Sequence, residues 1–158
     1  MWMAYVTIAI LIGIGVFIGL KQRKVLNGLK AEGKIVDRSF NFAEKGEEFT
    51  AKIGSYTALK EQLLKLVKIC AMEGNTSSVV KFQSKSYAAR LLRVDFDEAS
   101  GIGIFRFEFT RWKEGDHMYV DNTEMNMLMT AVEKAFLNLD PNTGVKKYNL
   151  SIKTKHSF

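Results

Sequence analysis

The sequence predicts an α+β domain that follows an N-terminal transmembrane helix. Three observations lead to this prediction. Residues 1–20 contain no charged side chain. After residue 34, apolar residues alternate along several short segments, as they do in strands with one buried face. Two further segments repeat apolar residues every three or four positions, which is typical of helices that cover one face of a sheet.

The first twenty residues have the length and composition of a membrane span. As a helix they would extend roughly 30 Å, the thickness of the hydrocarbon core of a bilayer. A signal peptide is the alternative, but it would begin with basic residues and have a shorter apolar core. Gly13-x-Gly15 is similar to a cleavage site, yet the apolar run continues past it. We therefore expect an uncleaved anchor at residues 1–20 that contacts membrane lipid.

The charges after this run predict its orientation. The net charge of the chain is +6, and no acidic residue precedes Ala31. Basic residues that flank a span are retained on the cytoplasmic side; here they are Lys21, Arg23 and Lys24. The prediction is a single-pass cell-membrane protein with its N-terminus outside, a basic connector at 21–34 and a cytoplasmic domain at 35–158. Because that domain is close to neutral, we do not expect nucleic acid as a partner.

Small residues within the apolar run predict pairing of the helix with a second copy. Gly13-x-Gly15 followed by Gly19 is also similar to a dinucleotide-binding loop, but such a loop needs a preceding strand and a water-exposed phosphate site. Residues four positions apart share a helix face, and glycine lets two backbones approach closely. The residues expected on this packing face are Ala9, Gly13, Gly15 and Gly19.

Alternating apolar residues predict the strands. Residues 35–43 and 49–53 flank an AEKG turn and are expected to form a hairpin. Further strands are expected at 79–83, 87–97 and 102–112, and a last one at 147–153. The side chains expected to face the core are Leu92, Val94 and Phe96, then Phe105, Phe107 and Phe109, and finally Tyr148, Leu150 and Ile152.

Two amphipathic helices are expected, at 55–73 and 121–139. Asp121 and Glu124 are placed for a capping box at the start of the second helix. The expected buried residues are Tyr56, Leu59, Leu63, Leu66, Val67 and Cys70 in the first helix, and Met125, Leu128, Met129, Val132, Phe136 and Leu139 in the second. The order of elements fits a tandem ββαβ arrangement. If the first hairpin is false and 79–97 is one bent strand, it fits a ferredoxin-like βαββαβ fold instead. Both options place two helices on one face of an antiparallel sheet.

Side chains with catalytic chemistry are scarce. His117 and His156 have no partner at metal-ligand spacing, and the single cysteine, Cys70, lies on the expected buried face of a helix. We therefore predict no catalytic residue, no metal and no cofactor. A small hydrolase that uses Asp, Tyr and Arg is the less favoured alternative.

The sheet face opposite the helices is the predicted contact surface. Its residues on the strand at 102–112 are Ile104, Arg106, Glu108 and Thr110. The same strand partly matches an RNA-recognition motif, but Ile102 and Ile104 stand where that motif needs stacking rings. We expect a non-catalytic binding or scaffold domain that binds a protein partner or a second copy. The alternative is a lipid-associated module that uses Lys21, Arg23 and Lys24 at the headgroups.

Overall fold

A computed structural model of the 158-residue chain describes residues 2–38, 42, 44–73, 78–112, 114–115, 118–119 and 122–150. Within these ranges, only the backbone is described for 2–13, 15, 114–115, 118–119 and 122. The chain divides into two compact units, Met1–Val36 and Asp37–Phe158.

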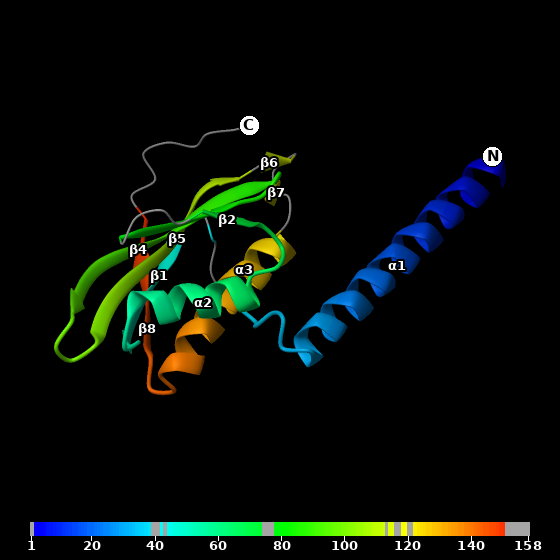
Figure 1. Ribbon diagram of the computed structural model, residues 1–158. Helices are drawn as coiled ribbons and strands as arrows, with labels where there is room; N and C mark the ends of the chain where they lie inside the picture. The colour runs from blue at the N-terminus through cyan, green and yellow to red at the C-terminus, as the bar shows by residue number, and fades with distance from the viewer. Residues whose placement is uncertain are drawn as a thin grey trace. The chain divides into compact units, whose positions relative to one another are not determined.

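The first unit is formed by one long helix, α1 (Trp2–Ala31), shown in Figure 1. It ends in a Schellman motif, in which the Lys34 N–H donates to the Leu29 carbonyl oxygen at 2.8 Å and the Gly33 N–H to that of Lys30 at 2.9 Å. Gly33 has a φ of 63°, the left-handed conformation that this motif requires. The helix therefore continues without a break through most of the segment predicted to be a connector.

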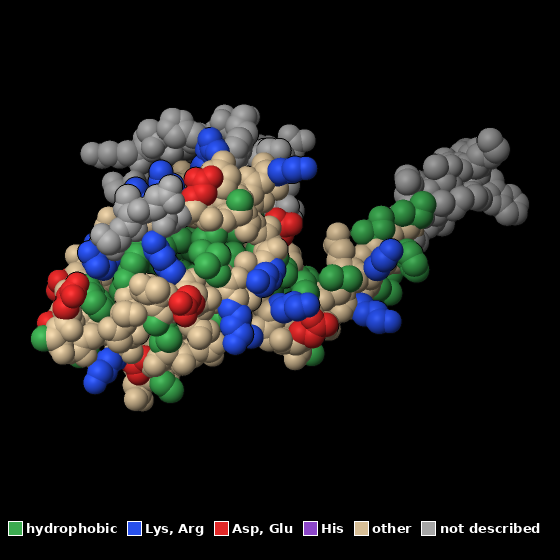
Figure 2. All heavy atoms as spheres, viewed as in Figure 1, with side chains coloured by type: hydrophobic (Ala, Val, Ile, Leu, Met, Phe, Trp, Pro, Cys, Tyr) green, Lys and Arg blue, Asp and Glu red, His purple; other side chains and the backbone are tan. Residues whose placement is uncertain are grey.

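The prediction of a transmembrane helix at residues 1–20 is wrong. Among the residues that the structure describes, no helix is long and apolar enough to cross a membrane. The side chains of α1 that are described begin at Ile14, and this part of the helix includes four basic residues: Lys21, Arg23, Lys24 and Lys30. Figure 2 shows basic side chains among the apolar ones there. The finding overturns the predicted single-pass topology, with its outside N-terminus and its cytoplasmic domain.

The second unit is a six-stranded antiparallel sheet with two helices on one face (Figure 1). The predicted α+β class is confirmed. In chain order the elements are β1 (Lys45–Lys52), α2 (Tyr56–Leu66), β2 (Ala71–Glu73), β3 (Val79–Gln83), β4 (Tyr87–Asp97), β5 (Ile102–Trp112), β6 (Glu114–Gly115), β7 (Met118–Tyr119), α3 (Asn122–Leu139) and β8 (Gly144–Asn149). The order in the large sheet is β2-β3-β4-β5-β1-β8, and β6 pairs with β7 separately.

The position of β1 bears on both predicted topologies. β1 lies between β5 and β8, so that Glu47 is opposite Phe107 on one side and Lys147 on the other. The chain then passes through α2 to the far edge strand β2, and later through α3 from β5 to the other edge, β8. The first hairpin of the tandem option is not formed by residues 35–38, which belong to no strand; residues 39–41 and 43 lie outside the described residues. The elements β1, α2, β4, β5, α3 and β8 instead follow the βαββαβ order of the ferredoxin-like alternative, and their strands are adjacent in the order β4-β5-β1-β8. That prediction merged β3 and β4 into one bent strand, whereas they are two separate strands, and β2 adds a further one at the edge.

The helix predicted at 55–73 is shorter than expected. Ser55 caps its start, where the Ser55 Oγ accepts a hydrogen bond from the Ala58 N–H at 3.2 Å. The helix ends at Leu66 because Val67 takes an extended conformation and the chain turns to pair β2 with β3. Pairing with β3 thus satisfies backbone groups that a longer helix would have satisfied internally.

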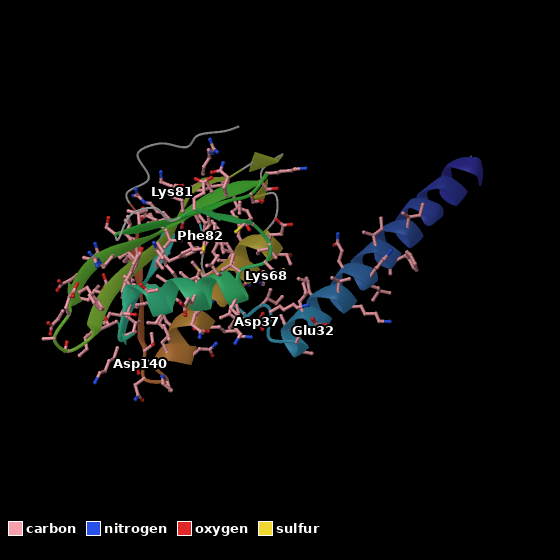
Figure 3. All side chains as sticks on the ribbon, viewed as in Figure 1. Glu32, Asp37, Lys68, Lys81, Phe82 and Asp140 are labelled. Carbon is pink, nitrogen blue, oxygen red and sulfur yellow. The ribbon has the colours of Figure 1, made fainter. Side chains whose placement is uncertain are left out.

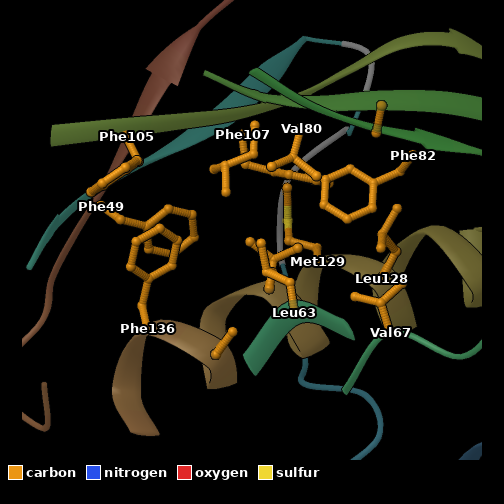
Figure 4. Close-up of a cluster of buried hydrophobic side chains, with 14 of the residues drawn as sticks. Phe49, Leu63, Val67, Val80, Phe82, Phe105, Phe107, Leu128, Met129 and Phe136 are labelled. Atoms are coloured by element: carbon orange, nitrogen blue, oxygen red, sulfur yellow. The ribbon is translucent and has the colours of Figure 1, made fainter. Parts of the chain in front are cut away.

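The core lies between the sheet and the two helices, as Figure 4 shows. Phe105, Phe107 and Phe109 are buried as predicted, and so are Met125, Leu128, Met129, Val132 and Phe136 of α3. The Phe49 and Phe136 rings stack at 4.5 Å between centroids, which joins β1 to α3. The predicted cap at Asp121 lies outside the described residues.

The predicted orientation of β4 is wrong for most of its length. Its buried residues are Tyr87, Ala89 and Leu91, and Val94 is exposed. A shift of register between Arg93 and Asp95 then changes which residues face the helices. Beyond this bulge, Phe96 packs against the core. Before the bulge, the alternate residues that would share its face point away from the core.

Candidate functional site

The sheet face that α2 and α3 leave uncovered is the candidate contact surface, and we call it the open face. Figure 3 illustrates the alternation in β3, where Lys81 lies on this side and Phe82 points toward the helices. In β5 the open face holds the four predicted residues, Ile104, Arg106, Glu108 and Thr110. Arg106 and Thr110 are exposed, and Ile104 and Glu108 are half-buried.

Neighbouring strands add oppositely charged partners to this row. Glu48 of β1 is opposite Arg106, and its Oε2 accepts a hydrogen bond from the Arg106 Nε at 2.7 Å. Arg90 of β4 is opposite Glu108, whose Oε1 accepts from the Arg90 Nε at 2.6 Å. The two arginine side chains are 46% and 45% exposed, whereas Glu108 and Glu48 are 14% and 21% exposed. The open face therefore presents guanidinium groups outward above a layer of carboxylates.

Tyr148 of β8 completes the cluster. Its hydroxyl donates to the Glu108 Oε2 at 3.0 Å, and the Arg106 guanidinium lies 5.3 Å from the centre of its ring. Burial and the negative charge of Glu108 raise the pKa of Tyr148 well above its ordinary value, so the phenol stays a donor at neutral pH. The ring lies against Gly46 of β1, where a Cβ atom would be 2.6 Å from it.

Sequence reasoning missed Tyr148 as a site residue, because the alternation of β8 was assigned the other way. Tyr148 was expected to face the core, but the register places it opposite Gly46 and toward the open face. The one local signal was Gly46, since a glycine inside a strand often marks a close approach by another group.

Arg106 is a side chain of the open face that has donors to spare for an anionic group. Arg106 uses its Nε for Glu48, and among the described residues its two terminal nitrogens have no hydrogen-bond partner. A guanidinium in this state can donate two parallel hydrogen bonds to a carboxylate. Glu48 and the Tyr148 ring hold the side chain in place.

A second polar cluster lies on the helix side of the sheet, around Arg38. The Arg38 side chain is 5% exposed and donates to four groups. These are the Glu47 Oε1 at 3.3 Å, the Asn126 Oδ1 at 2.6 Å, the Thr130 Oγ1 at 2.8 Å and the Glu133 Oε2 at 2.5 Å. Arg38 therefore ties the segment before β1 to both β1 and α3.

Two carboxylates, Glu47 and Glu133, converge on Arg38 in this cluster, so it bears on the hydrolase alternative. Burial raises the pKa of Glu47, the charge of Arg38 opposes that effect, and Glu133 adds to it. The Glu47 Oε2 is buried and has no hydrogen-bond partner among the described residues. The Arg38 guanidinium occupies the space between the two carboxylates, which favours a structural role over proton transfer to a substrate.

The other predicted residues lie on α1 in the first unit. Lys21, Arg23 and Lys24 are exposed. A Cβ atom on Gly19 would meet nothing within 4 Å, and the backbones of Ala9, Gly13 and Gly15 are helical.

Few groups in the described residues suit metal or thiol chemistry. Cys70 is half-buried, and burial raises the pKa of its thiol. No three His, Cys, Asp or Glu side chains of the described ranges are grouped to hold a metal ion. His117 and His156 lie outside those ranges.

Comparison with known proteins adds no functional assignment. No protein-family model matches the chain, and no curated protein matches it. The functional conclusion is therefore based on the geometry of the open face.

Proposed function

We propose that the unit Asp37–Phe158 is a non-catalytic protein-binding module and that its open face is the contact surface. The observation that carries this proposal is that the Arg106 side chain is both exposed and held in place. It is 45% exposed, its Nε donates to Glu48, and its guanidinium lies over the Tyr148 ring. The complementary group is an acidic side chain of a partner protein. A second copy of the domain is the other occupant to be tested.

Preorganisation of Arg106 supports this role. A flexible arginine loses rotamer entropy when it binds, whereas one that is already held loses less. Arginine is also enriched among the residues that contribute most to protein interfaces. Half-buried Ile104 and Leu92 lie beside it on β5 and β4 and offer apolar contact area.

The carboxylates of the open face favour binding over acid–base chemistry. Glu108 accepts hydrogen bonds from Arg90 and Tyr148, and Glu48 accepts one from Arg106. Oxygens that are already engaged by donors have little capacity to take a proton from a substrate. We therefore assign these groups to the positioning of the arginines.

Photo-crosslinking in cells that express the full chain tests the proposal. A photoreactive amino acid at Thr110 reports on the open face, and one at exposed Glu61 of α2 is the matched control. We expect adducts from position 110 and not from position 61. An adduct of twice the chain mass identifies a second copy as the occupant.

Charge reversal at one position decides whether Arg106 is the anchor. Arg106→Glu should abolish the adduct from position 110, while Lys65→Glu, the same charge change on exposed α2, should preserve it. Equal adducts from positions 110 and 61, or an adduct that survives Arg106→Glu, would contradict the proposal.

A further inference from the structure

The last strand of the sheet has a neighbour on one side only. β8 pairs with β1, and no other described strand pairs with its outer side. The Leu150 N–H donates to the Glu44 carbonyl oxygen at 2.8 Å. Because alternate residues of an antiparallel strand direct their backbone groups to opposite sides, those of Val145 and Asn149 face away from β1. The outer side of β8 thus carries the donors and acceptors that an additional strand needs.

The side chains along this edge are basic on both faces of the sheet. Lys146 and Lys147 are adjacent and exposed, so they project to opposite faces, and β8 contains no acidic residue. Neither carboxylate of the neighbouring strand serves a β8 lysine alone, because Glu48 is paired with Arg106, and Glu47, whose pKa burial raises and the charge of Lys147 lowers, is also paired with Arg38. Both faces of the edge therefore favour a negatively charged neighbour.

We propose that β8 binds an extended acidic segment of a partner protein as a seventh strand of the sheet. The outward backbone groups of β8 supply the main-chain hydrogen bonds of strand addition. Lys146 and Lys147 select adjacent acidic side chains, one on each face. This site is the outer backbone edge of β8, whereas Arg106 lies on β5 and meets β8 only at the Tyr148 ring, so strand addition extends the open-face proposal without depending on it.

Charge decides among the possible occupants. A second copy pairing through its own β8 would place Lys146 and Lys147 of the two chains close together, and like charges across a strand pair are destabilising. The chain's own residues 151–158 contain two lysines and no acidic residue. An acidic segment from another protein is the occupant that complements this edge.

Peptide titration of the isotope-labelled full chain tests the proposal. The probe is a seven-residue peptide of Val and Thr with a central Glu-Glu pair, and the matched peptide has Lys-Lys at the same positions. We expect the acidic peptide to bind at least about tenfold more tightly and to lose affinity as salt is raised. It should also slow hydrogen exchange of the Val145 and Asn149 amides.

One pair of variants separates strand addition from simple charge attraction, and a second pair tests the charge preference itself. Val145→Pro removes an outward N–H without removing a hydrogen bond to β1, whereas Val145→Thr keeps that N–H. We expect the proline to weaken binding of the acidic peptide about tenfold and the threonine to preserve it. Because proline can also disturb folding, the pair Lys146→Glu and Lys147→Glu gives a second test, in which preference should move to the Lys-Lys peptide.

Three results would overturn the proposal. They are equal affinity for the two peptides, unchanged binding by a folded Val145→Pro variant, and amide changes that are absent from β8. Arg106→Glu should leave peptide binding at β8 intact, so the failure of strand addition and the failure of the open-face proposal can be told apart.

Discussion

Replacement of Arg38 by methionine should destabilise the second unit strongly, because it leaves Glu47 buried without a counter-charge. Both side chains are 5% exposed, and the Glu47 Oε2 has no hydrogen-bond partner among the described residues even when Arg38 is present. Removal of one partner of a buried ion pair typically costs about 3–5 kcal/mol. We expect a loss of this size in the free energy of unfolding at pH 8, where an exposed carboxyl is ionised.

The loss should become smaller at low pH. Burial raises the pKa of Glu47 above its ordinary value of 4.5, and the charge of Arg38 limits that rise. A carboxyl whose pKa is raised in the folded state destabilises the fold when it is ionised. This penalty is absent at a pH below the pKa of the group in the unfolded chain, and it is complete at a pH above its pKa in the folded chain. Without Arg38 the folded pKa rises further, so the penalty grows by about 1.4 kcal/mol per unit of added shift.

Urea unfolding of the full chain at pH 5 and pH 8 measures both effects. Arg38→Met should lose more stability at pH 8 than at pH 5. Adding Glu47→Gln to Arg38→Met should restore part of the loss at pH 8 and remove most of its pH dependence. A loss below about 1 kcal/mol, or one that is equal at the two pH values, would refute the assignment of Glu47 as a carboxylate that depends on Arg38.

Three further predictions concern single positions. Phe136→Ala should lower the free energy of unfolding by about 3–5 kcal/mol in urea, because the ring is fully buried and stacks on Phe49 at 4.5 Å; a loss under about 1 kcal/mol would contradict this packing. Gly46→Ala should cost about 1–3 kcal/mol and lower the melting temperature, since its Cβ would lie 2.6 Å from the Tyr148 ring and 2.7 Å from a main-chain oxygen of β5. The Cys70 thiol should react with a disulfide reagent at pH 7.5 at least about tenfold more slowly than free cysteine, because burial raises its pKa; a rate equal to that of the free amino acid would show that it is accessible.

Elements with long, regular patterns could be predicted from the sequence. β5 alternates Phe105, Phe107 and Phe109 with polar residues, and its bounds were predicted correctly. The apolar face of α3 was likewise predicted, because it repeats over five turns before Pro141. In both cases the information is local and extends over more than ten residues.

Features that depend on distant partners could not be predicted in this way. The bulge between Arg93 and Asp95 inverts the faces of β4, and nothing in the alternation of its own residues marks the change. Tyr148 reaches the open face because β8 pairs with β1 in a particular register, and pairing registers across such distances leave no periodic signal. The predicted membrane span was wrong for a different reason: the helix was expected to end where the basic residues begin, whereas α1 continues through four of them to Ala31.

The central position of β1 has a consequence for synthesis of the chain. Phe49 and Ala51 are translated early, but their partners on β5 follow more than fifty residues later, at Phe105 and Gly103. At about 5–20 residues per second, ribosomes need roughly 3–11 seconds to produce that partner strand. During this interval the apolar residues of β1 are exposed on the nascent chain, where chaperones that bind short apolar segments can reach them.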